Sequence, residues 1–503
     1  MIKLKYKIKR GDIMKKRTII GASIATAAAA NAVHAALYTP KKSASEPLPK
    51  ETINVQRYRE NLSKAIQFKT ISYRESERVD WAEFEKFHKH LDEAYPLIAK
   101  NLEKEVIPPA NLLYRWKGTR SDLEPMALLA HQDVVPVSAG TEDDWVHDAF
   151  SGHDDGEFIW GRGAIDMKNH LIAVMESVEA LLEDGFVPER DVYLLFGDNE
   201  EVVANDDNGA RDLMTTLKNR GITLDSVIDE GGAMIPLNVP GVLENKYLTG
   251  IGVAEKGFTD VEIVVNAKGG HSSQPPSHTA LGEIADIIKD LEKNQFKAYL
   301  DKNMKMLFDA IGRECTYPVK LLTCNLPLLY PVITQAAKLV PFTACLIRTT
   351  TAITMAQGSP ASNVLPQRAA ITVNFRTMPG VTKQDVVDHI RKACKAKDIE
   401  INILNSKIAS PFSPTDTRVY NIIGDLARSL QSDAIVVPYL VMGGTDAYYY
   451  YPICKNVYRY APFRLTPELL LCTHGTNERI PVALLEEAVV FFKNYIKKAS
   501  AEK

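Results

Sequence analysis

The stretch Val192-Tyr-Leu-Leu-Phe-Gly-Asp-Asn-Glu-Glu201 decides the fold of this chain. Its first five residues are apolar or aromatic, which is typical of a buried strand, and Glu200 and Glu201 follow shortly after it. Adjacent carboxylates at the end of a strand point in different directions, so one can bind a cation while its neighbour faces whatever the cation holds. The ordinary alternative is a solvated acidic turn, because exposed glutamates are common.

Two other apolar runs also end in residues that can bind a metal. The run Met126-Ala-Leu-Leu-Ala leads into His131, and the run Ser226-Val-Ile leads into Asp229. Asp166 lies in a glycine-rich loop just before a predicted amphipathic helix. Because the carboxyl ends of strands meet in one crevice of an open α/β sheet, we expect these side chains to converge there.

The residues expected at this crevice suit a pair of divalent ions roughly 3.5 Å apart, as in hydrolytic two-metal sites. The five expected metal ligands are His131, Asp166, Glu201, Asp229 and His474. Asp166 is assigned as the bridge between the ions, which leaves one histidine and one carboxylate for each. Histidine and carboxylate without thiolate predict two zinc ions per chain, although cobalt or manganese would also fit.

Two acidic residues at the crevice are expected to act without binding the metal. Asp133, two residues after His131, is placed to orient that imidazole. Glu200 stays free to take a proton from metal-activated water and to give it to a leaving amine, as general base and then general acid. The other histidines considered have the ordinary interpretation of core or surface residues: His88, His90, His147, His153, His170, His278 and His389.

The length and composition predict a globular protein of two or three domains. The chain has 503 residues, 45% of them hydrophobic and 24% charged, and a net charge of -3 gives no electrostatic reason to bind nucleic acid. Alternating apolar residues at 261–265 and 371–375, each followed by a predicted helix, indicate an α+β domain inserted over about residues 255–408. Residues 52–254 and 409–503 then form one domain of the α/β class.

The N-terminus has the parts of a secretory signal. Met14-Lys-Lys-Arg is followed by an uncharged run from Thr18 to Ala36 that is rich in alanine. Residues 1–36 are therefore predicted to be a signal peptide, with an uncleaved membrane anchor as the alternative, and residues 37–51 a flexible linker. Export to a periplasm or to the outside of the cell follows, with membrane attachment if the segment is retained.

The cysteines predict no disulfide scaffold, because they are few and scattered and none forms a Cys-x-x-Cys pair. Export would permit a bridge among the first three of them. The six cysteines are Cys315, Cys324, Cys345, Cys394, Cys454 and Cys472.

The order and spacing of these segments resemble the M20 family of dinuclear zinc peptidases, which includes aminoacylase, carboxypeptidase S, glutamate carboxypeptidase and succinyl-diaminopimelate desuccinylase. The resemblance extends from about residue 55 to the C-terminal end. The matching segments are His131-Gln-Asp133, Trp160-Gly-Arg-Gly-Ala-Ile-Asp166-Met-Lys, Glu200-Glu201, Asp229-Glu-Gly-Gly, Gly270-His271-Ser-Ser, Ser362-Asn363-Val-Leu-Pro, Asn374-Phe-Arg376 and Thr473-His474-Gly475. The Trp-Gly-Arg-Gly-Ala segment and the large insertion look most like the carboxypeptidase S branch, which also contains hydrolases of N-fatty-acyl amino acids.

This resemblance implies a three-layer α/β/α zinc-peptidase domain with an inserted, ferredoxin-like α+β lid, and a cis peptide bond after Asp166. It also implies that His271 donates to the developing oxyanion, that Asn363 contacts the substrate and that Arg376 binds its terminal carboxylate. In many relatives the histidine equivalent to His271 reaches the partner subunit's site. That arrangement implies a homodimer through the lid, although the lid here is longer than usual.

We expect a zinc-dependent hydrolase that cleaves the amide bond of a peptide or an N-acyl amino acid with a free terminal carboxylate: a carboxypeptidase, a dipeptidase or an aminoacylase. Water held by two zinc ions attacks the carbonyl, with Glu200 as the general base. The rival from another class is a non-catalytic exported binding protein that keeps the fold, and the presence of the base and of every ligand type argues against it. The choice of Asp229 over Glu230 as a ligand rests on the family pattern.

Overall fold

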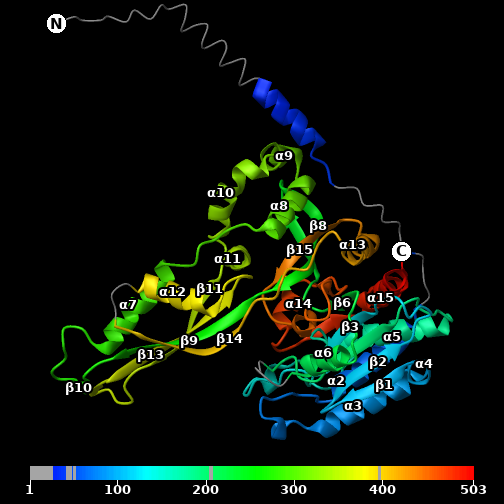
Figure 1. Cartoon of the computed structure of the whole chain (residues 1–503), viewed down its shortest axis with the longest axis horizontal. Coiled ribbons are helices and arrows are strands. Elements are labelled where there is room, and N and C mark those ends of the chain that lie inside the picture. The colour runs from blue at the N-terminus through cyan, green and yellow to red at the C-terminus, as the bar shows by residue number, and fades with distance from the viewer. Residues whose placement is uncertain (1–25, 41–47, 49–52, 203–207, 395–397, 503) are drawn as a thin grey trace, which may run out of the picture.

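A nine-stranded sheet forms the centre of the larger domain (Figure 1). The computed structural model describes residues 26–40, 48, 53–202, 208–394 and 398–502. The strand order is β1-β2-β5-β3-β6-β16-β8-β15, with β7 paired to β8. These strands are β1 (Glu103–Ile107), β2 (Asn111–Trp116), β3 (Met126–His131), β5 (Val192–Gly197), β6 (Ser226–Asp229), β7 (Met234–Val239), β8 (Leu243–Glu255), β15 (Ala434–Val441) and β16 (Val457–Arg459).

The middle of this sheet is parallel and buried on both faces. Strand β3 pairs in parallel with β5 and with β6, and β6 pairs in parallel with β16. Neighbouring residues of one strand enter different cores: Leu128 and Leu194 belong to the core on one face, and Leu129 and Leu195 to the core on the other. A strand covered on both sides needs apolar residues at every position, which explains the unbroken run at 192–196.

Helices cover both faces of the sheet, which gives the three-layer α/β/α arrangement (Figure 1). Helix α5 packs against β3, α2, α4 and α15, whereas α6 packs against β2 and β5 on the opposite face. The helices of this domain are α2 (Val55–Gln67), α3 (Trp81–Ala94), α4 (Pro96–Asn101), α5 (Lys168–Glu183), α6 (Gly209–Asn219), α13 (Arg418–Leu430), α14 (Pro467–Cys472) and α15 (Leu485–Ser500). A small two-stranded sheet joins β4 (Phe158–Trp160) to β17 (Arg479–Pro481).

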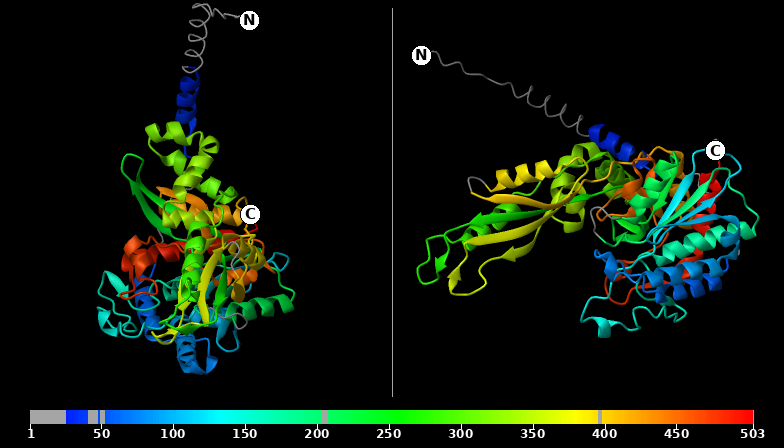
Figure 2. Two further views of the ribbon diagram at one scale, coloured as in Figure 1. Left: turned by 90° about the vertical axis from the view of Figure 1, so that its left-hand side faces the viewer. Right: turned by 60° about the horizontal axis from the view of Figure 1, so that its bottom comes forward.

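The smaller domain is an antiparallel sheet with the strand order β11-β13-β9-β14, and we call it the lid. It projects from the larger domain as a second lobe (Figures 1 and 2). Alternate residues Val261, Ile263 and Val265 of β9 pack into one core with helices α7 and α12. Its elements are β9 (Gly257–Asn266), α7 (Ala280–Lys293), β11 (Thr350–Gln357), β13 (Arg368–Thr377), α12 (Lys383–Ala393), β14 (Glu400–Lys407) and the two-stranded antiparallel sheet of β10 (Gly270–His271) with β12 (Val364–Leu365).

Part of the predicted insertion 255–408 does not join the lid. It forms four helices beside the main sheet, where α8 packs against β15. Met304 and Leu307 of α8 share a core with Ile435 and Val437 of β15, because that edge of the sheet is apolar and needs cover. These helices are α8 (Lys302–Glu314), α9 (Tyr317–Thr323), α10 (Leu326–Ala337) and α11 (Pro341–Ile347).

Only part of the predicted N-terminal segments falls within the described residues. Residues 26–37 form a helix, whereas residues 1–25 of the predicted signal peptide and most of the predicted linker lie outside the described part of the chain. No helix within that described part has the length and apolarity needed to cross a bilayer. No disulfide joins any of the six cysteines, all of which lie in the described part of the chain.

Candidate metal centre

The candidate site lies at the carboxyl ends of three parallel strands. Strands β5, β3 and β6 are neighbours, and His131 at the end of β3 is in register with Gly197 at the end of β5. Glu200 and Glu201 follow β5, and Glu230 follows β6. The sheet therefore brings together side chains that are far apart in the sequence, as open α/β sheets do at this edge.

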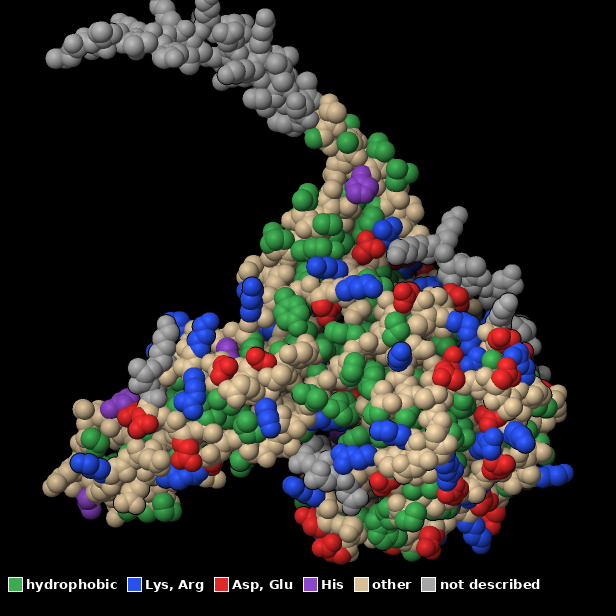
Figure 3. Space-filling view, in the orientation of Figure 1, with side chains coloured by type: hydrophobic (Ala, Val, Ile, Leu, Met, Phe, Trp, Pro, Cys, Tyr) green, Lys and Arg blue, Asp and Glu red, His purple; other side chains and the backbone are tan. Residues whose placement is uncertain are grey.

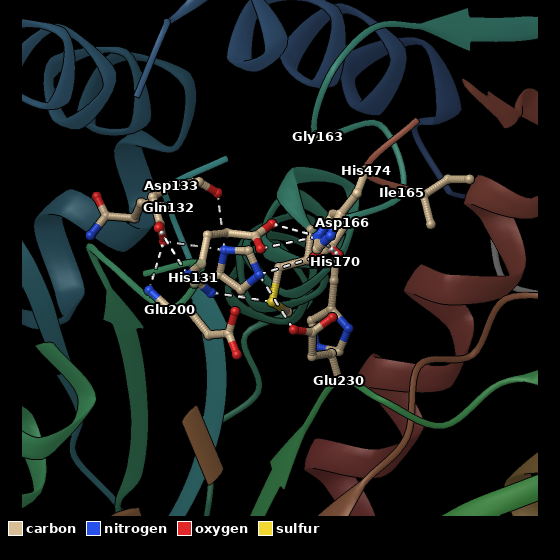
Figure 4. Close-up of polar contacts among 12 residues, drawn as sticks. His131, Gln132, Asp133, Gly163, Ile165, Asp166, His170, Glu200, Glu230 and His474 are labelled. Atoms are coloured by element: carbon tan, nitrogen blue, oxygen red, sulfur yellow. Dashed lines mark hydrogen bonds and ion pairs between the residues drawn. The ribbon is translucent and has the colours of Figure 1, made fainter. Parts of the chain in front are cut away.

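Asp166 lies between two histidines in this cluster (Figure 4). Its Oδ1 is 3.1 Å from Nε2 of His131, and its Oδ2 is 3.1 Å from Nε2 of His474. Each histidine has a second carboxylate: Glu230 Oε1 is 3.3 Å from Nε2 of His131, and Glu201 Oε2 is 3.0 Å from Nε2 of His474. The cluster thus consists of two half-sites, each with one histidine and one glutamate, that share Asp166.

Asp229, which the sequence analysis expects as a ligand, faces away from this cluster. Its Oδ1 accepts a hydrogen bond of 2.9 Å from the backbone N–H of Glu230, and its Oδ2 accepts one of 2.7 Å from the backbone N–H of Ala447. Successive side chains along extended backbone point to opposite sides, so when Asp229 faces Ala447 its neighbour faces His131. In this geometry Glu230, and not Asp229, lies within 3.3 Å of His131, so Glu230 is the alternative to the expected ligand Asp229.

Asp133 lies beside His131 and beneath the pair of glutamates. Its Oδ1 is 3.3 Å from Nδ1 of His131, and its backbone oxygen is 3.0 Å from the same ring nitrogen. Its carboxylate also accepts hydrogen bonds from the backbone N–H groups of Glu200, at 3.1 Å, and Glu201, at 3.2 Å. One buried carboxylate therefore fixes both the orientation of His131 and the turn that carries the glutamates.

The loop that carries Asp166 is held by the buried carboxylate of Glu478. Oε1 of Glu478 accepts hydrogen bonds from three backbone N–H groups of the loop, including that of Asp166 at 3.1 Å. Oε2 of Glu478 is 2.5 Å from Nη1 of the buried Arg162. Since Glu478 follows His474 by four residues, one short segment supplies a histidine and also orders the loop of the shared carboxylate.

The backbone of this loop explains its glycines. Gly161 and Gly163 have φ values of +141° and +89°, a region that glycine enters freely and other residues avoid. A Cβ atom on Gly161 would also collide with the side chain of Ile66. The peptide bond between Asp166 and Met167 is cis, which confirms that prediction.

Carboxylates are crowded together out of water in this cluster. Burial raises the pKa of Glu230 to about 8, and the negative charge of Asp166 adds to the shift. Burial also raises the pKa values of Glu200 and Asp446 well above their usual range, and Oδ1 of Asp446 has no hydrogen-bond partner among the described residues. Burial alone would lower the pKa of His131, but hydrogen bonds to its carboxylate neighbours outweigh that effect and raise it. Such a cluster is suited to divalent cations.

A cleft of about 1030 Å³ separates this cluster from the lid. Glu200, Glu201 and His474 of the larger domain line one side, and Arg376 and Lys407 of the lid line the other. The space-filling view shows the hollow between the two lobes (Figure 3). The cleft thus has an acidic side at the metal-binding residues and a basic side on the lid.

Arg376 and Lys407 belong to one cross-strand row of the lid sheet, on either side of Phe258. Cζ of Arg376 is 5.8 Å from the centre of the Phe258 ring, and Nζ of Lys407 is 4.0 Å from the centre of the Tyr448 ring. Burial lowers the pKa of Lys407. Among the residues that the structure describes, neither cation forms an ion pair, so both are free to meet an anion in the cleft.

The other two residues that the resemblance assigns to the substrate lie at the far end of the lid. His271 is in β10, and the backbone oxygen of Asn363 accepts a hydrogen bond of 3.1 Å from the N–H of Ser272. Both side chains are exposed, and Figure 1 places β10 at the tip of the lid, away from the larger domain. Within one chain, the structure does not bring His271 or Asn363 to the metal-binding residues.

Two residues of the site, Glu478 and Lys407, escaped the sequence analysis as functional candidates. Glu230 was weighed there against its neighbour Asp229, but the sequence alone gave no orientation for either side chain. Glu478 lies close to His474, so an acidic residue near an expected ligand was the available signal. Lys407 ends β14 with no motif around it, and only the register of the lid sheet reveals its place in the cleft.

Comparison with known proteins matches residues 127–498 to the model described as peptidase family M20/M25/M40. A probable carboxypeptidase S-like 2 of Dictyostelium discoideum is 35% identical over 443 residues, which cover 87% of this chain and 84% of that protein. An N-fatty-acyl-amino acid synthase/hydrolase of Xenopus tropicalis is 32% identical over 447 residues, covering 88% of this chain and 86% of that protein. Carboxypeptidase S of Saccharomyces cerevisiae is 30% identical over 461 residues, covering 82% and 78%.

Solved structures share the fold at low sequence identity. An M20 family metallo-carboxypeptidase from Sulfolobus solfataricus superposes with a TM-score of 0.63 and 17% identity, covering 88% of this chain and 99% of that chain. Human carnosine dipeptidase 1 gives a TM-score of 0.59 and 13% identity, covering 89% and 96%. These likenesses support the fold class that the sequence predicts.

The contacts of Glu478 predict that this residue stabilises the site without binding a metal. Glu478→Gln leaves the guanidinium of Arg162 buried without a counter-charge, which costs about 3–5 kcal/mol of the free energy of unfolding. The loop of Asp166 also loses order, so affinity for divalent cations falls by about 10–100-fold. Denaturant unfolding and equilibrium dialysis of the metal measure the two effects.

The control for this variant is Glu468→Gln, which removes a charge from an exposed ion pair with Arg479. We expect that variant to match the wild type in both measurements, because solvent screens exposed pairs. Wild-type stability and wild-type metal affinity in Glu478→Gln would contradict the role given to Glu478.

Proposed function

This chain belongs to peptidase family M20/M25/M40, and we propose that it hydrolyses the amide bond of a peptide or an N-acyl amino acid whose terminal carboxylate is free. Its relatives make it an enzyme of the peptidase or aminoacylase type that uses a divalent metal. The observation that carries the finer proposal is the cluster of two half-sites that share Asp166 at the head of the cleft.

We assign two zinc ions to this cluster, one in each half-site. His131 and Glu230 would hold one ion, His474 and Glu201 the other, and Asp166 both. Imidazole and carboxylate donors without thiolate suit zinc in a catalytic site and leave positions open for substrate. When bound, the ions would lower the pKa of water and polarise the carbonyl group of the substrate.

Glu200 is the residue we assign to proton transfer. Ligand atoms of Glu200, His131 and Glu230 lie within 4.8 Å of one another, so Glu200 borders the half-site of His131. Among the described residues, no side chain donates a hydrogen bond to its carboxylate, which leaves it free to accept a proton. Glu200 would take the proton of the attacking water and then give it to the nitrogen that leaves.

Arg376 and Lys407 would hold the terminal carboxylate of the substrate. Both line the lid side of the cleft, opposite the acidic cluster, and neither is neutralised by an ion pair among the described residues. A guanidinium and an ammonium can both donate charge-assisted hydrogen bonds to a carboxylate. The substrate would therefore lie with its carboxylate on the lid and its amide carbonyl at the metal side.

The same cleft offers apolar surface for the rest of the substrate. Ile403, Leu404 and Ile408, in and after β14, line it with exposed fractions of 41%, 56% and 62%. Exposed apolar side chains add little to the stability of the fold. These three would bind an apolar acyl group or side chain of the substrate. This surface supports N-acyl amino acids with apolar acyl groups as substrates, in keeping with the named activity of the Xenopus tropicalis relative.

His271 would act in the cleft of a second copy of the chain. Its place at the tip of the lid is too remote for its own metal site, while the two-stranded sheet that carries it is exposed and accessible to another chain. There it would donate a hydrogen bond to the oxyanion that forms during the attack. A homodimer through the lid follows from this assignment.

The role of Glu200 predicts that Glu200→Gln keeps its metal but loses turnover. The amide cannot accept the proton of the attacking water, so kcat falls by about 10²–10⁴-fold. Turnover of an N-acyl amino acid, measured beside the metal content of the same preparation, tests this. Near-normal kcat with full metal content would remove Glu200 from the mechanism.

The same variant tests the shared site. When Glu200→Gln is mixed with His271→Ala, half of the dimers are mixed and each mixed dimer has one intact site, so activity recovers to about a quarter of the wild type. Each variant alone, taken through the same mixing procedure, is the control. A mixture no more active than its components would mean that His271 does not act in a partner's cleft.

The orientation of Glu230 predicts which acidic residue binds the metal. We expect Glu230→Gln to hold about one zinc ion per chain instead of two, because one half-site loses a charged ligand. Asp229→Asn should keep both ions, since Asp229 faces backbone N–H groups and not the cluster. Elemental analysis after dialysis measures this, and the reverse result would return the ligand role to Asp229.

The positions of Arg376 and Lys407 on the lid predict how the enzyme prefers substrates with a free carboxylate to the matching amides. Arg376→Ala and Lys407→Met should each raise KM for N-acyl amino acids by about 10–100-fold, the equivalent of one charged hydrogen bond, and leave KM for the matching amides unchanged. Arg368→Ala is the matched control, because Arg368 lies on the same strand but pairs with Glu262. Unaltered selectivity in both variants would place carboxylate recognition elsewhere.

A further inference from the structure

Helices α9 and α10 and the turn that follows α10 (residues 338–340), which we together call the outer helices, form an apolar surface away from the cleft. Leu322, Leu328, Val332 and Leu339 are exposed by 63%, 79%, 64% and 83%, which is unusual for large aliphatic side chains grouped in one short segment. Figure 3 shows hydrophobic side chains at this end of the molecule, and Figure 1 places the outer helices at the end opposite the body of the larger domain. Nothing in the proposed reaction uses them.

The charges of this segment have one sign. Residues 317–340 contain Lys320 and Lys338 but no aspartate or glutamate. A protein surface normally mixes both signs, so an apolar segment whose own charges are all positive is suited to an anionic and apolar partner. Bilayers with anionic headgroups have both properties.

The N-terminal helix, residues 26–37, is seated on the same surface. Nδ2 of Asn31 donates a hydrogen bond of 2.9 Å to the backbone oxygen of Leu321, and the hydroxyl of Tyr317 donates one of 3.2 Å to the backbone oxygen of Ala32. Ala35, just before the end of the helix, is buried in one small cluster with Cys324. The helix is thus attached to α9 by specific contacts and not merely adjacent to it.

The attachment continues beyond the helix and fixes its direction. The hydroxyl of Tyr38 donates a hydrogen bond of 2.9 Å to Oδ1 of Asp309, and the guanidinium of Arg313 lies 4.4 Å from the centre of the Tyr38 ring. Val33 and Leu37 of the helix are exposed by 60% and 74%, so the apolar surface extends onto it. Residues 26–36, the described part of the uncharged run, therefore meet the folded protein at the outer helices.

We propose that the outer helices rest on the surface of a lipid bilayer that contains anionic lipids. Their exposed aliphatic side chains would enter the boundary between headgroups and acyl chains, and their cations would meet the headgroups. Helices α9 and α10 have 7 and 12 residues, lengths that allow them to lie in the interface but not to cross it. The N-terminal helix, with Val33 and Leu37 exposed, would rest on the same bilayer beside them, which makes lipid the favoured partner over a second protein chain.

Hydrogen exchange of the full chain tests this proposal residue by residue. We expect vesicles of phosphatidylcholine with phosphatidylglycerol to slow amide exchange in residues 317–340, and vesicles of phosphatidylcholine alone to slow it less. The variant that combines Leu322→Glu, Leu328→Glu, Val332→Glu and Leu339→Glu should lose this protection. Its binding to the vesicles should weaken by about tenfold or more, because apolar area is what drives the partitioning.

A control variant distinguishes the effect of changing the outer helices from a general effect of added negative charge. Val106→Glu with Val187→Glu changes two exposed valines of the larger domain and should keep the protection. Unchanged exchange of the core strands in every variant reports that the fold is intact. Protection confined to residues 26–37 would overturn the proposal, since the N-terminal helix alone would then bind lipid. Protection that rises with protein concentration without vesicles would also overturn it, because a second copy would then cover the surface.

Discussion

The structure depends on the cost of holding carboxylates together out of water. Asp166, Glu201 and Glu230 meet at the ends of three strands, with Glu200 and Asp446 beside them. Such a cluster is unfavourable without positive charge, so the fold and the metal are coupled: the chain builds a site that only cations complete. The apolar cores on both faces of the sheet supply the rigidity that keeps these groups from moving apart.

A buried ion pair near the carboxylate cluster connects the metal site to the start of the lid. At the end of β8, Oε1 of Glu255 is 3.0 Å from Nη2 of Arg459, and Oε2 accepts a hydrogen bond of 2.7 Å from the backbone N–H of Thr445, next to Asp446. The chain enters the lid two residues later, at Gly257. The buried carboxylate of Glu255 therefore connects the wall of the metal site to the point where the lid begins.

Periodicity and strand order were enough to predict the strands and most of the site residues from the sequence. The direction in which each side chain points could not be predicted in this way. The unbroken run before Glu200 can only be a strand covered on both sides, and His131, Asp166, Glu201 and His474 do meet. The choice between two neighbouring acids at the end of β6 needed the direction of each side chain, which sequence does not contain. The helices of residues 302–347 look like part of the insertion along the chain, but an apolar edge of the main sheet attracts them.

The separation of charge across the cleft gives the reaction a direction. In the proposed reaction, the carboxylate of the substrate would bind to Arg376 and Lys407, which lie on either side of Phe258 in the lid sheet, and this contact would fix the orientation in which the substrate enters. That orientation would present the amide carbonyl to the two half-sites and would leave the other half of the substrate along β14. Because the basic row belongs to the lid and the acidic cluster to the larger domain, recognition and catalysis would then lie on different lobes. Glu255 lies at the junction between them, two residues before the lid begins.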